Sequence, residues 1–367
     1  MTYEEYLRAL PKVELHCHFM GSVPVGAMAA LIARHKTSLP VDVHTLYANI
    51  NSPNRPNPIY AKARVPVPVS DPSREPNPSY PLLDVSRWIT PLFKDREDFA
   101  TAIHAALGAF TESHIRYCEM FFEPTLFADE GIPYPTMVDG LIDGLRQAER
   151  DWGIRCRLVA GINRAQPPAR AVQLVEEMVA NPRDEVIGIG IEDYELSGYP
   201  ELFVEAYQLA ERHGLHRTAH ASEHRPSAES ITVCLDKLHC ERIDHGYFIL
   251  EDDSVVARAR DLQIPFTTIS TTSRRSWRGW RRTCIRMMDA AGLNVIIGAD
   301  DPGMFPTNLS NEYVIGGLEL GFDRARMNRM CLAAVDASWQ SASEKQAMRA
   351  QFTREIDRLT AEGVSPP

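Results

Sequence analysis

Eight short runs rich in valine, isoleucine and aromatic residues recur along this chain, and segments with helical periodicity separate them. The runs lie at residues 13–19, 115–123, 154–163, 186–193, 215–221, 242–248, 264–270 and 294–299. Strands that alternate with helices form a parallel sheet, and eight such units favour closure into a barrel. Several helical segments end in glycine before the next strand, at Gly153, Gly214 and Gly292, as helix C-termini prefer. We therefore predict an α/β fold of the (β/α)8 (TIM) barrel class.

Two regions depart from this alternation. Residues 49–81 are crowded with proline and asparagine, and proline sustains neither a helix nor a central strand. Residues from about 308 onward are helical in pattern. We expect one domain over residues 1–367, because α/β barrels commonly reach this length. The insertion at 49–81 is either a solvent-exposed loop or a lid or oligomer contact, and the C-terminal helical segment is expected to pack across the outside of the barrel.

Composition narrows the classes of partner. The net charge of -10 argues against a nucleic-acid partner, because phosphate binding needs a basic face. The sequence has no apolar run of about 20 residues, so we expect no membrane partner. The N-terminal segment is acidic and amphipathic rather than a signal peptide, and the seven cysteines have no CxxC spacing. Reduced thiols and a cytoplasmic location are therefore expected, while the oligomeric state stays open.

Four of the eight runs end in residues that bind metals or move protons. The fragments are His16-Cys17-His18, His220, His245 and Asp300-Asp301. Strand ends of a parallel barrel converge on one mouth. Alternation along a strand projects His16 and His18 to one face and Cys17 to the other. A candidate metal site therefore consists of His16, His18, His220 and Asp300, and imidazole with carboxylate suits Zn²⁺, with Fe²⁺ or Mn²⁺ as alternatives.

Three further residues are candidates for proton transfer. Glu223 lies three residues after His220, at the mouth of the same strand, and is a candidate proton donor to the substrate. A bound zinc ion lowers the pKa of a coordinated water molecule, and His245 and Asp301 are candidates to orient and deprotonate that water. Taken singly, His245 could be a hydrogen-bonded core histidine and Asp300-Asp301-Pro302 a turn. Their common placement at strand ends favours the metal site.

Two other metal motifs are excluded. Residues 220–224, HASEH, match the HxxEH pattern of some metalloproteases. That motif requires a helix, on which positions i and i+4 share a face, whereas here it follows a strand and precedes Pro226. His224 is therefore expected to have a supporting or surface role. The zinc site of cytidine deaminases requires a PCxxC partner, which this sequence lacks.

At these residues the chain resembles the adenosine/adenine deaminase family of the amidohydrolase superfamily. PKVELHCHFMGS is similar to the family's opening PKxELHxHLxGs, HASE to its HAGE, RIDHG to its RI(G/D)HG and GADDPGMF to its sDDPxxF. CEMFFEPTLFADEGI and GIGIEDYE look closer to the adenine deaminases, which carry YxExFFDPQxHxxxGi and GxGLDSSE. The similar fragments span residues 11 to about 313, which is nearly the whole predicted barrel.

The resemblance implies a barrel of the amidohydrolase type with one zinc ion, held by His16, His18, His220 and Asp300. It also implies hydrolytic deamination of an adenine-type aminopurine, with Glu223 protonating the ring nitrogen beside the attacked carbon and with His245 and Asp301 activating the water. The substrate would be adenine, adenosine or a modified or anionic derivative, and ammonia would be released. An aminohydrolase of a non-purine heterocycle, such as a pterin, is an alternative. A catalytically silent binding protein is a third hypothesis, against which the intact set of site residues argues.

The departures from the family pattern concern the substrate rather than the metal. Met20 stands where family members usually carry an acid, and Ser222 stands where HAGE has glycine. The family's GLDSSE becomes IEDYE at residues 191–195, which introduces Asp193 and Tyr194. We therefore expect Met20, Asp193, Tyr194 and Ser222 to contact a substrate edge that differs from the family's usual one.

A concentrated basic stretch follows the seventh predicted strand. The family's CPxSN is replaced by ISTTS at 269–273, and RRSWRGWRR follows at 274–282. Guanidinium groups match phosphate or carboxylate, and tryptophan offers a stacking plane. The stretch is either a solvated helix N-terminus whose arginines pair with surface acids, or an anion-recognising loop at the barrel rim. In the second case Arg274 and Arg275 would contact a substrate larger or more anionic than adenine.

Overall fold

The computed structural model describes residues 1–364 and contains one parallel eight-stranded sheet in sequential order. The strands are β1 (Lys12–His18), β2 (Ile115–Phe122), β3 (Arg155–Asn163), β4 (Val186–Glu192), β5 (His216–Ala221), β6 (Ile243–His245), β7 (Pro265–Thr268) and β8 (Asn294–Ile297). Beyond β8, Asp300 forms a parallel bridge with Cys17 of β1. The N–H of His18 donates to the carbonyl of Asp300 at 3.0 Å, which brings the last strand back to the first. The predicted (β/α)8 barrel is confirmed.

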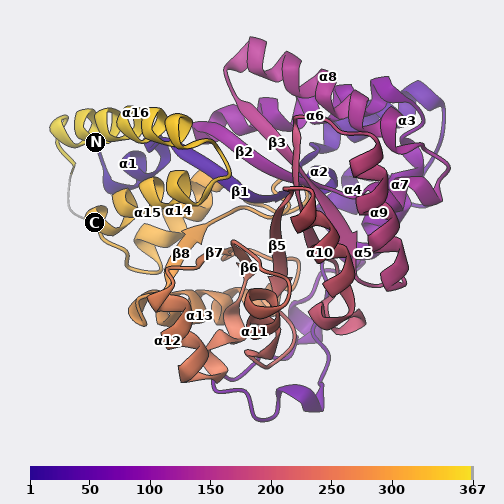
Figure 1. Cartoon of the computed structure of the whole chain (residues 1–367). Helices are drawn as coiled ribbons and strands as arrows, with labels where there is room; N and C mark the ends of the chain where they lie inside the picture. The colour runs from indigo at the N-terminus through magenta and orange to yellow at the C-terminus, as the bar shows by residue number, and fades with distance from the viewer. Residues whose placement is uncertain (365–367) are drawn as a thin grey trace.

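Helices alternate with the strands and surround them (Figure 1). Those between β1 and β8 are α2 (Phe19–Ser22), α3 (Val25–His35), α4 (Val43–Ala48), α5 (Leu82–Ile89), α6 (Arg96–Phe110), α7 (Pro124–Asp129), α8 (Tyr134–Trp152), α9 (Pro168–Ala180), α10 (Val204–Arg212), α11 (Glu229–Asp236), α12 (Asp253–Asp261) and α13 (Arg278–Ala290). Short 3-10 helices are η1 (Pro58–Tyr60), η2 (Pro72–Arg74), η3 (Thr90–Leu92), η4 (Thr111–Ser113), η5 (Glu195–Ser197), η6 (Pro200–Phe203), η7 (Tyr247–Glu251) and η8 (Arg275–Trp277). Within residues 1–364, every helix is too short or too polar to cross a membrane.

The second half of the barrel has shorter strands than the sequence predicts. β6 ends at His245 rather than at 248, because His245 and Gly246 both adopt positive φ, 68° and 80°, and the chain turns into η7. β7 and β8 each stop two residues before their predicted ends. The glycines at 153, 214 and 292 all have positive φ, which confirms the predicted helix endings.

The N-terminal helix and the C-terminal helices pack together on the outside of the barrel, next to β1 and β8. The helices outside the β1–β8 units are α1 (Tyr3–Ala9), α14 (Leu309–Leu318), α15 (Arg324–Ala337) and α16 (Ala342–Ala361). α15 lies against β1 and β8, and α1 lies against α14. The N-terminal amine donates to the carbonyl of Gly363 at 3.0 Å, so the N-terminus lies beside the segment that follows α16 (Figure 1).

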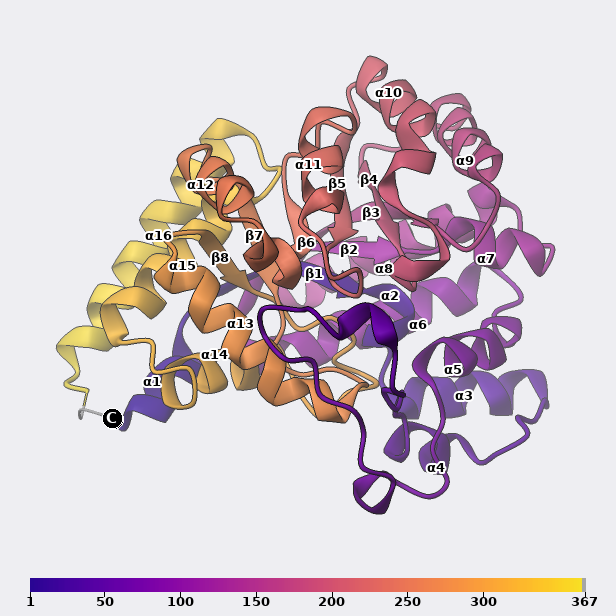
Figure 2. The ribbon, with the colours of Figure 1, turned by 90° about the horizontal axis from the view of Figure 1, so that it is seen from below.

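Residues 49–81 are irregular apart from η1, η2 and a bridge between Ile50 and Tyr80. Figure 2 shows this segment running from α4 and α5 toward α13. The hydroxyl of Tyr60 donates to the carbonyl of His224 at 3.0 Å, and the Trp280 indole donates to the carbonyl of Val65 at 3.2 Å. The insertion is therefore attached to the loop that follows β5 and to α13.

Candidate metal centre and active site

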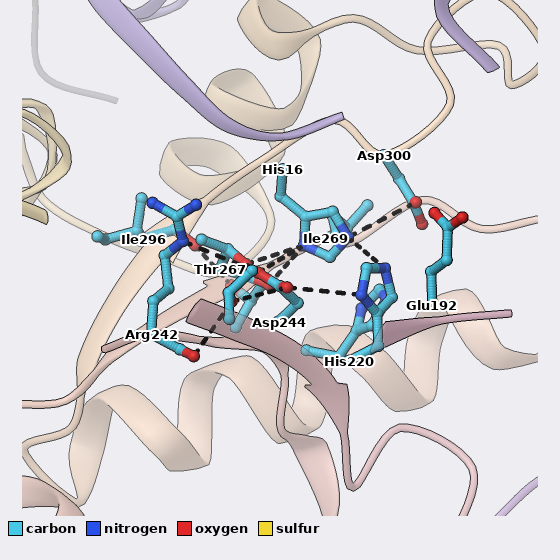
Figure 3. Close-up of polar contacts among 12 residues, drawn as sticks. His16, Glu192, His220, Arg242, Asp244, Thr267, Ile269, Ile296 and Asp300 are labelled. Atoms are coloured by element: carbon cyan, nitrogen blue, oxygen red, sulfur yellow. Dashed lines mark hydrogen bonds and ion pairs between the residues drawn. The ribbon is translucent and has the colours of Figure 1, made fainter. Parts of the chain in front are cut away.

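Three imidazole nitrogens and one carboxylate oxygen converge at the carboxyl ends of the strands. Nε2 of His220, on β5, lies 3.1 Å from Nε2 of His16 and 3.2 Å from Nε2 of His18, both on β1. Oδ1 of Asp300, which follows β8, lies 3.8 Å and 3.4 Å from the His16 and His18 nitrogens. Ligand atoms about 2.1 Å from one zinc ion lie roughly 3.4 Å apart in a tetrahedron. Figure 3 shows His16, His220 and Asp300 directed toward one another.

The remaining ring nitrogens of two of these histidines face one buried carboxylate, that of Asp244. The hydroxyl of Thr267 donates to Asp244 Oδ1 at 2.8 Å, so Thr267 Oγ1 accepts from His16 Nδ1–H, also at 2.8 Å. Nδ1 of His220 lies 3.5 Å from Asp244 Oδ2. Protons on Nδ1 leave the Nε2 lone pairs free toward the shared point, which is the form of a metal-binding histidine.

The third histidine, His18, faces two glutamates. Its Nδ1 lies 3.0 Å from Glu192 Oε2 and 3.7 Å from Glu123 Oε1. Burial alone would lower the pKa of His18, but these two carboxylates raise that pKa well above its usual value. Burial also raises the pKa of Glu123 to about 7, and the neighbouring Glu192 adds to the rise. Glu192 therefore holds the proton on Nδ1 of His18, which leaves Nε2 directed toward the other two histidines.

The paired aspartates carry charge that a cation would offset. Burial raises the pKa of Asp300 to about 7, with Asp301 adding to the rise, and burial raises the pKa of Asp301 to about 6. A divalent ion beside Asp300 would compensate this cost. The Asp301 carboxylate packs against Gly21, where an added Cβ would lie 1.7 Å from Oδ1, so only glycine fits there. Three imidazoles and a carboxylate fit a zinc ion by chemistry, and the nitrogens of the three imidazoles also fit by spacing.

Glu223 and His245 lie beside this cluster. Oε1 of Glu223 is 3.6 Å from His245 Nε2 and forms an ion pair with Arg281 Nη2, and Oε2 is 3.0 Å from His224 Nδ1. Burial alone would raise the pKa of Glu223, but His224, His245 and Arg281 hold it well below its usual value. Burial lowers the pKa of His245 well below its usual value, so its imidazole is neutral and can accept a proton.

A buried glutamate fixes the turn that carries Glu223. Both carboxylate oxygens of Glu195 accept backbone N–H groups, at 2.7–2.9 Å, from Ser222, Glu223, His224 and Arg225. Ser222 itself is fully buried, and its hydroxyl donates to the carbonyl of Ser227 at 2.8 Å. Ser222 therefore has contacts within the turn, and it is not among the residues of the cavity wall.

One cavity of about 490 Å³ connects these groups, a volume typical of a small-molecule site. Of the residues predicted from the sequence, its wall contains His18, Met20, Asp193, Tyr194, His220, Glu223, His245, Arg274, Asp300 and Asp301. His16 is fully buried beneath this wall, and Arg275 lies outside it. The basic stretch is helical from Arg275 onward, but Trp277, Trp280 and Arg281 are buried rather than solvated.

Sequence reasoning missed several supporting residues, among them Thr267, Glu123 and Glu192 beside the histidines, and also Asp244, Glu195 and Arg281. Asp244 had a signal, since it is an acid inside an apolar strand next to His245, and such an acid needs a buried partner. Glu195 is the glutamate that GIGIEDYE shares with the family's GxGLDSSE, but its supporting role was not predicted from that match. Arg281 was visible only as one of the five arginines of residues 274–282. Which of them faces inward depends on where α13 begins.

Comparison with known proteins agrees with this geometry. The model of the adenosine deaminase family matches residues 78–355. An adenine deaminase from Ectopseudomonas mendocina is 30% identical over 336 residues, which cover 91% of this chain and 98% of that protein. The crystal structure of an amidohydrolase from Burkholderia ambifaria with bound Zn is 30% identical, with a TM-score of 0.84, and the match covers 98% of this chain and 94% of that one. The structure of an adenine deaminase from Arthrobacter aurescens is 25% identical, with a TM-score of 0.80 and coverage of 95% and 99%. This chain belongs to the adenosine deaminase family.

Proposed function

We propose that this protein is a zinc-dependent aminohydrolase that removes the amino group of an adenine-type purine and releases ammonia. The convergence of Nε2 of His16, His18 and His220 with Oδ1 of Asp300 carries the proposal. The zinc in the Burkholderia ambifaria amidohydrolase and the activity named for the two adenine deaminases support the metal and the substrate class.

The residues around the cluster supply the acid–base chemistry. Zinc, when bound, lowers the pKa of a water molecule so that it can attack at neutral pH. His245 is the base, because burial keeps its imidazole neutral. Asp301 orients the attacking water, because it lies on the cavity wall directly after Asp300. Both residues lie on the same cavity wall as Glu223, so the base that activates the water and the acid that protonates the ring nitrogen face the same bound substrate.

Glu223 carries the proton to the ring nitrogen. A purine ring nitrogen is a hydrogen-bond acceptor, so Glu223 has to be protonated when the substrate reaches it. Before that, Arg281 and His224 keep the carboxylate ionised. Burial lowers the pKa of His224, so its neutral imidazole, with Nδ1 at 3.0 Å from Oε2, positions the carboxylate, and the proton that Glu223 delivers is taken up from water in the cavity. Binding of the purine against Glu223 therefore weakens the ion pair with Arg281.

The test is ammonia release from zinc-loaded protein with adenine, adenosine and a pterin. Glu223→Gln keeps the shape of the side chain but cannot transfer the proton, so we expect deamination to fall by roughly 10²- to 10⁴-fold with unchanged zinc content. Glu229→Gln is the matched control, because Glu229 pairs with Arg225 outside the cavity. Unaltered turnover in Glu223→Gln would contradict the role of Glu223 as proton carrier. Ammonia release from the pterin alone would contradict a purine as the substrate.

A further inference from the structure

A cation without an anionic partner lies on the cavity wall. Arg274, which follows β7, is partly buried, and within residues 1–364 its guanidinium forms no ion pair and no hydrogen bond. Its charge lies 5.3 Å from the ring centroid of Tyr194 and 5.4 Å from that of Trp277. Two other arginines of the same stretch form ion pairs, Arg281 with Glu223 and Arg282 with Glu319, and Arg275 lies outside the cavity wall. A partly desolvated cation held between aromatic rings is ready to accept an anion.

A second unpaired cation lines the same cavity from the insertion. Arg55 forms no ion pair or hydrogen bond in the described part of the chain. The two cations come from segments that are bonded to each other: the N–H of Ser52 donates to the carbonyl of Ser273 at 3.0 Å, and their hydroxyls are 3.2 Å apart. The insertion and the segment after β7 therefore bring both guanidinium groups to one rim.

The acids at this rim do not neutralise the two cations. Asp84 pairs with Arg87 at 3.3 Å, and the Asp193 carboxylate accepts the backbone N–H of Tyr194. The wall also contains Met20, which removes an acidic contact that an anionic ligand would meet in the family pattern. Deeper in the same cavity, Arg281 is already engaged by Glu223. Arg274 and Arg55, at the rim of the cavity, are therefore the cations on its wall that an anionic ligand can pair with.

We propose that the substrate is an aminopurine with a phosphate or carboxylate group that binds Arg274 and Arg55 while the ring reaches Glu223. This inference rests on the proposed deamination and narrows its substrate class. Arginine binds both anions through paired, charge-assisted hydrogen bonds. A bare purine would leave both cations without a partner and part of the cavity unfilled.

The test compares kcat/KM for adenosine, adenosine 5′-monophosphate and adenosine 5′-carboxylate. We expect the anionic substrates to be preferred, and we expect Arg274→Gln to reduce the ratio of kcat/KM for the anionic substrates to kcat/KM for adenosine roughly 10- to 100-fold. Arg275→Gln is the matched control, because Arg275 is adjacent but lies outside the cavity wall. Preference for the phosphate alone identifies a nucleotide substrate, and equal preference for both anions identifies a general anion subsite.

Inorganic phosphate provides a test that does not depend on where the anion is attached to the purine. Phosphate should inhibit deamination competitively with the anionic substrate, and Arg274→Gln should raise the inhibition constant by a factor similar to the loss of substrate preference. Equal kcat/KM for neutral and anionic purines, unchanged in Arg274→Gln, would overturn the subsite and leave the deamination standing. Ammonia release from no purine would overturn the proposed function, while calorimetric phosphate binding that needs Arg274 and not Arg275 would still support the subsite.

Discussion

At the scale of single residues, the tautomers of the histidines matter as much as their positions. A histidine in the wrong tautomer presents an N–H instead of a lone pair to the metal. The carboxylate of Asp244 is fully buried and accepts hydroxyl hydrogen bonds from Thr218 and Thr267, both at 2.8 Å. Asp244 acts on His16 through Thr267 and on His220 directly. It therefore favours a proton on Nδ1 of both candidate ligands.

Asp244→Asn should therefore weaken zinc binding. The amide can place N–H groups where the histidine protons and the threonine hydroxyls now point, so we expect zinc affinity to fall roughly 10- to 100-fold. Competition with a chelator of known affinity measures it. Glu119→Gln is the control, because Glu119 is an equally buried carboxylate that pairs with Arg242 and contacts no candidate ligand. Equal zinc affinities in the two variants would contradict the role given to Asp244.

At the scale of elements, the strand ends hold an unusual backbone conformation. Four non-glycine residues at or just after the ends of β4, β5, β6 and β8 have φ of 52–73°, namely Asp193, Ser222, His245 and Asp300. The left-handed region costs such residues of order 1 kcal/mol each. Tertiary hydrogen bonds offset this cost: Glu195 accepts the N–H of Ser222, and the carbonyl of His16 accepts that of Asp300. These turns place side chains from four strands at the cavity.

The insertion should depend on one aromatic anchor. The ring of Tyr60 stacks on Phe248 at 6.0 Å and meets Trp277 edge-on at 5.7 Å, and its hydroxyl binds the backbone of His224. Tyr60→Ala should release residues 49–81, with faster limited proteolysis in this segment and a raised KM. Ile59→Ala is the neighbouring control, because 42% of Ile59 is exposed. Identical cleavage rates in the two variants would show that the anchor lies elsewhere.

At the scale of the whole molecule, a buried lysine at the opposite end of β1 makes folding sensitive to pH. Lys12 is fully buried, and its Nζ donates to the carbonyls of Arg8 and Leu10 at 2.9 Å and 2.8 Å. Burial lowers the pKa of Lys12 from 10.5 to about 7. Between these two values the unfolded chain binds more protons at this residue than the folded chain does. Its contribution to stability therefore rises with pH across that window and is constant below it.

The free energy of unfolding should rise by up to about 1.4 kcal/mol per pH unit between pH 7 and 10 because of this residue. Lys12→Met should lose that part of the slope, and urea unfolding of both proteins at several pH values measures the difference. Lys62→Met, at an exposed lysine, should keep the slope of the original protein. Parallel pH curves for the original protein and Lys12→Met would mean that Lys12 stays protonated in the fold.

The sequence by itself determined the barrel and the candidate metal ligands. Alternating strand and helix periods are local properties, and a parallel barrel brings strand ends together whatever its packing details. The tertiary structure decided which side chains support those ligands and which reach the cavity. Only the start of α13 at Arg278 turns Arg281 inward and leaves Arg275 outside, and only the left-handed turns at strand ends direct His245 and Asp300. Helix starts and strained turns depend on contacts between distant segments, such as those of Glu195 and Asp244, which local periodicity does not contain.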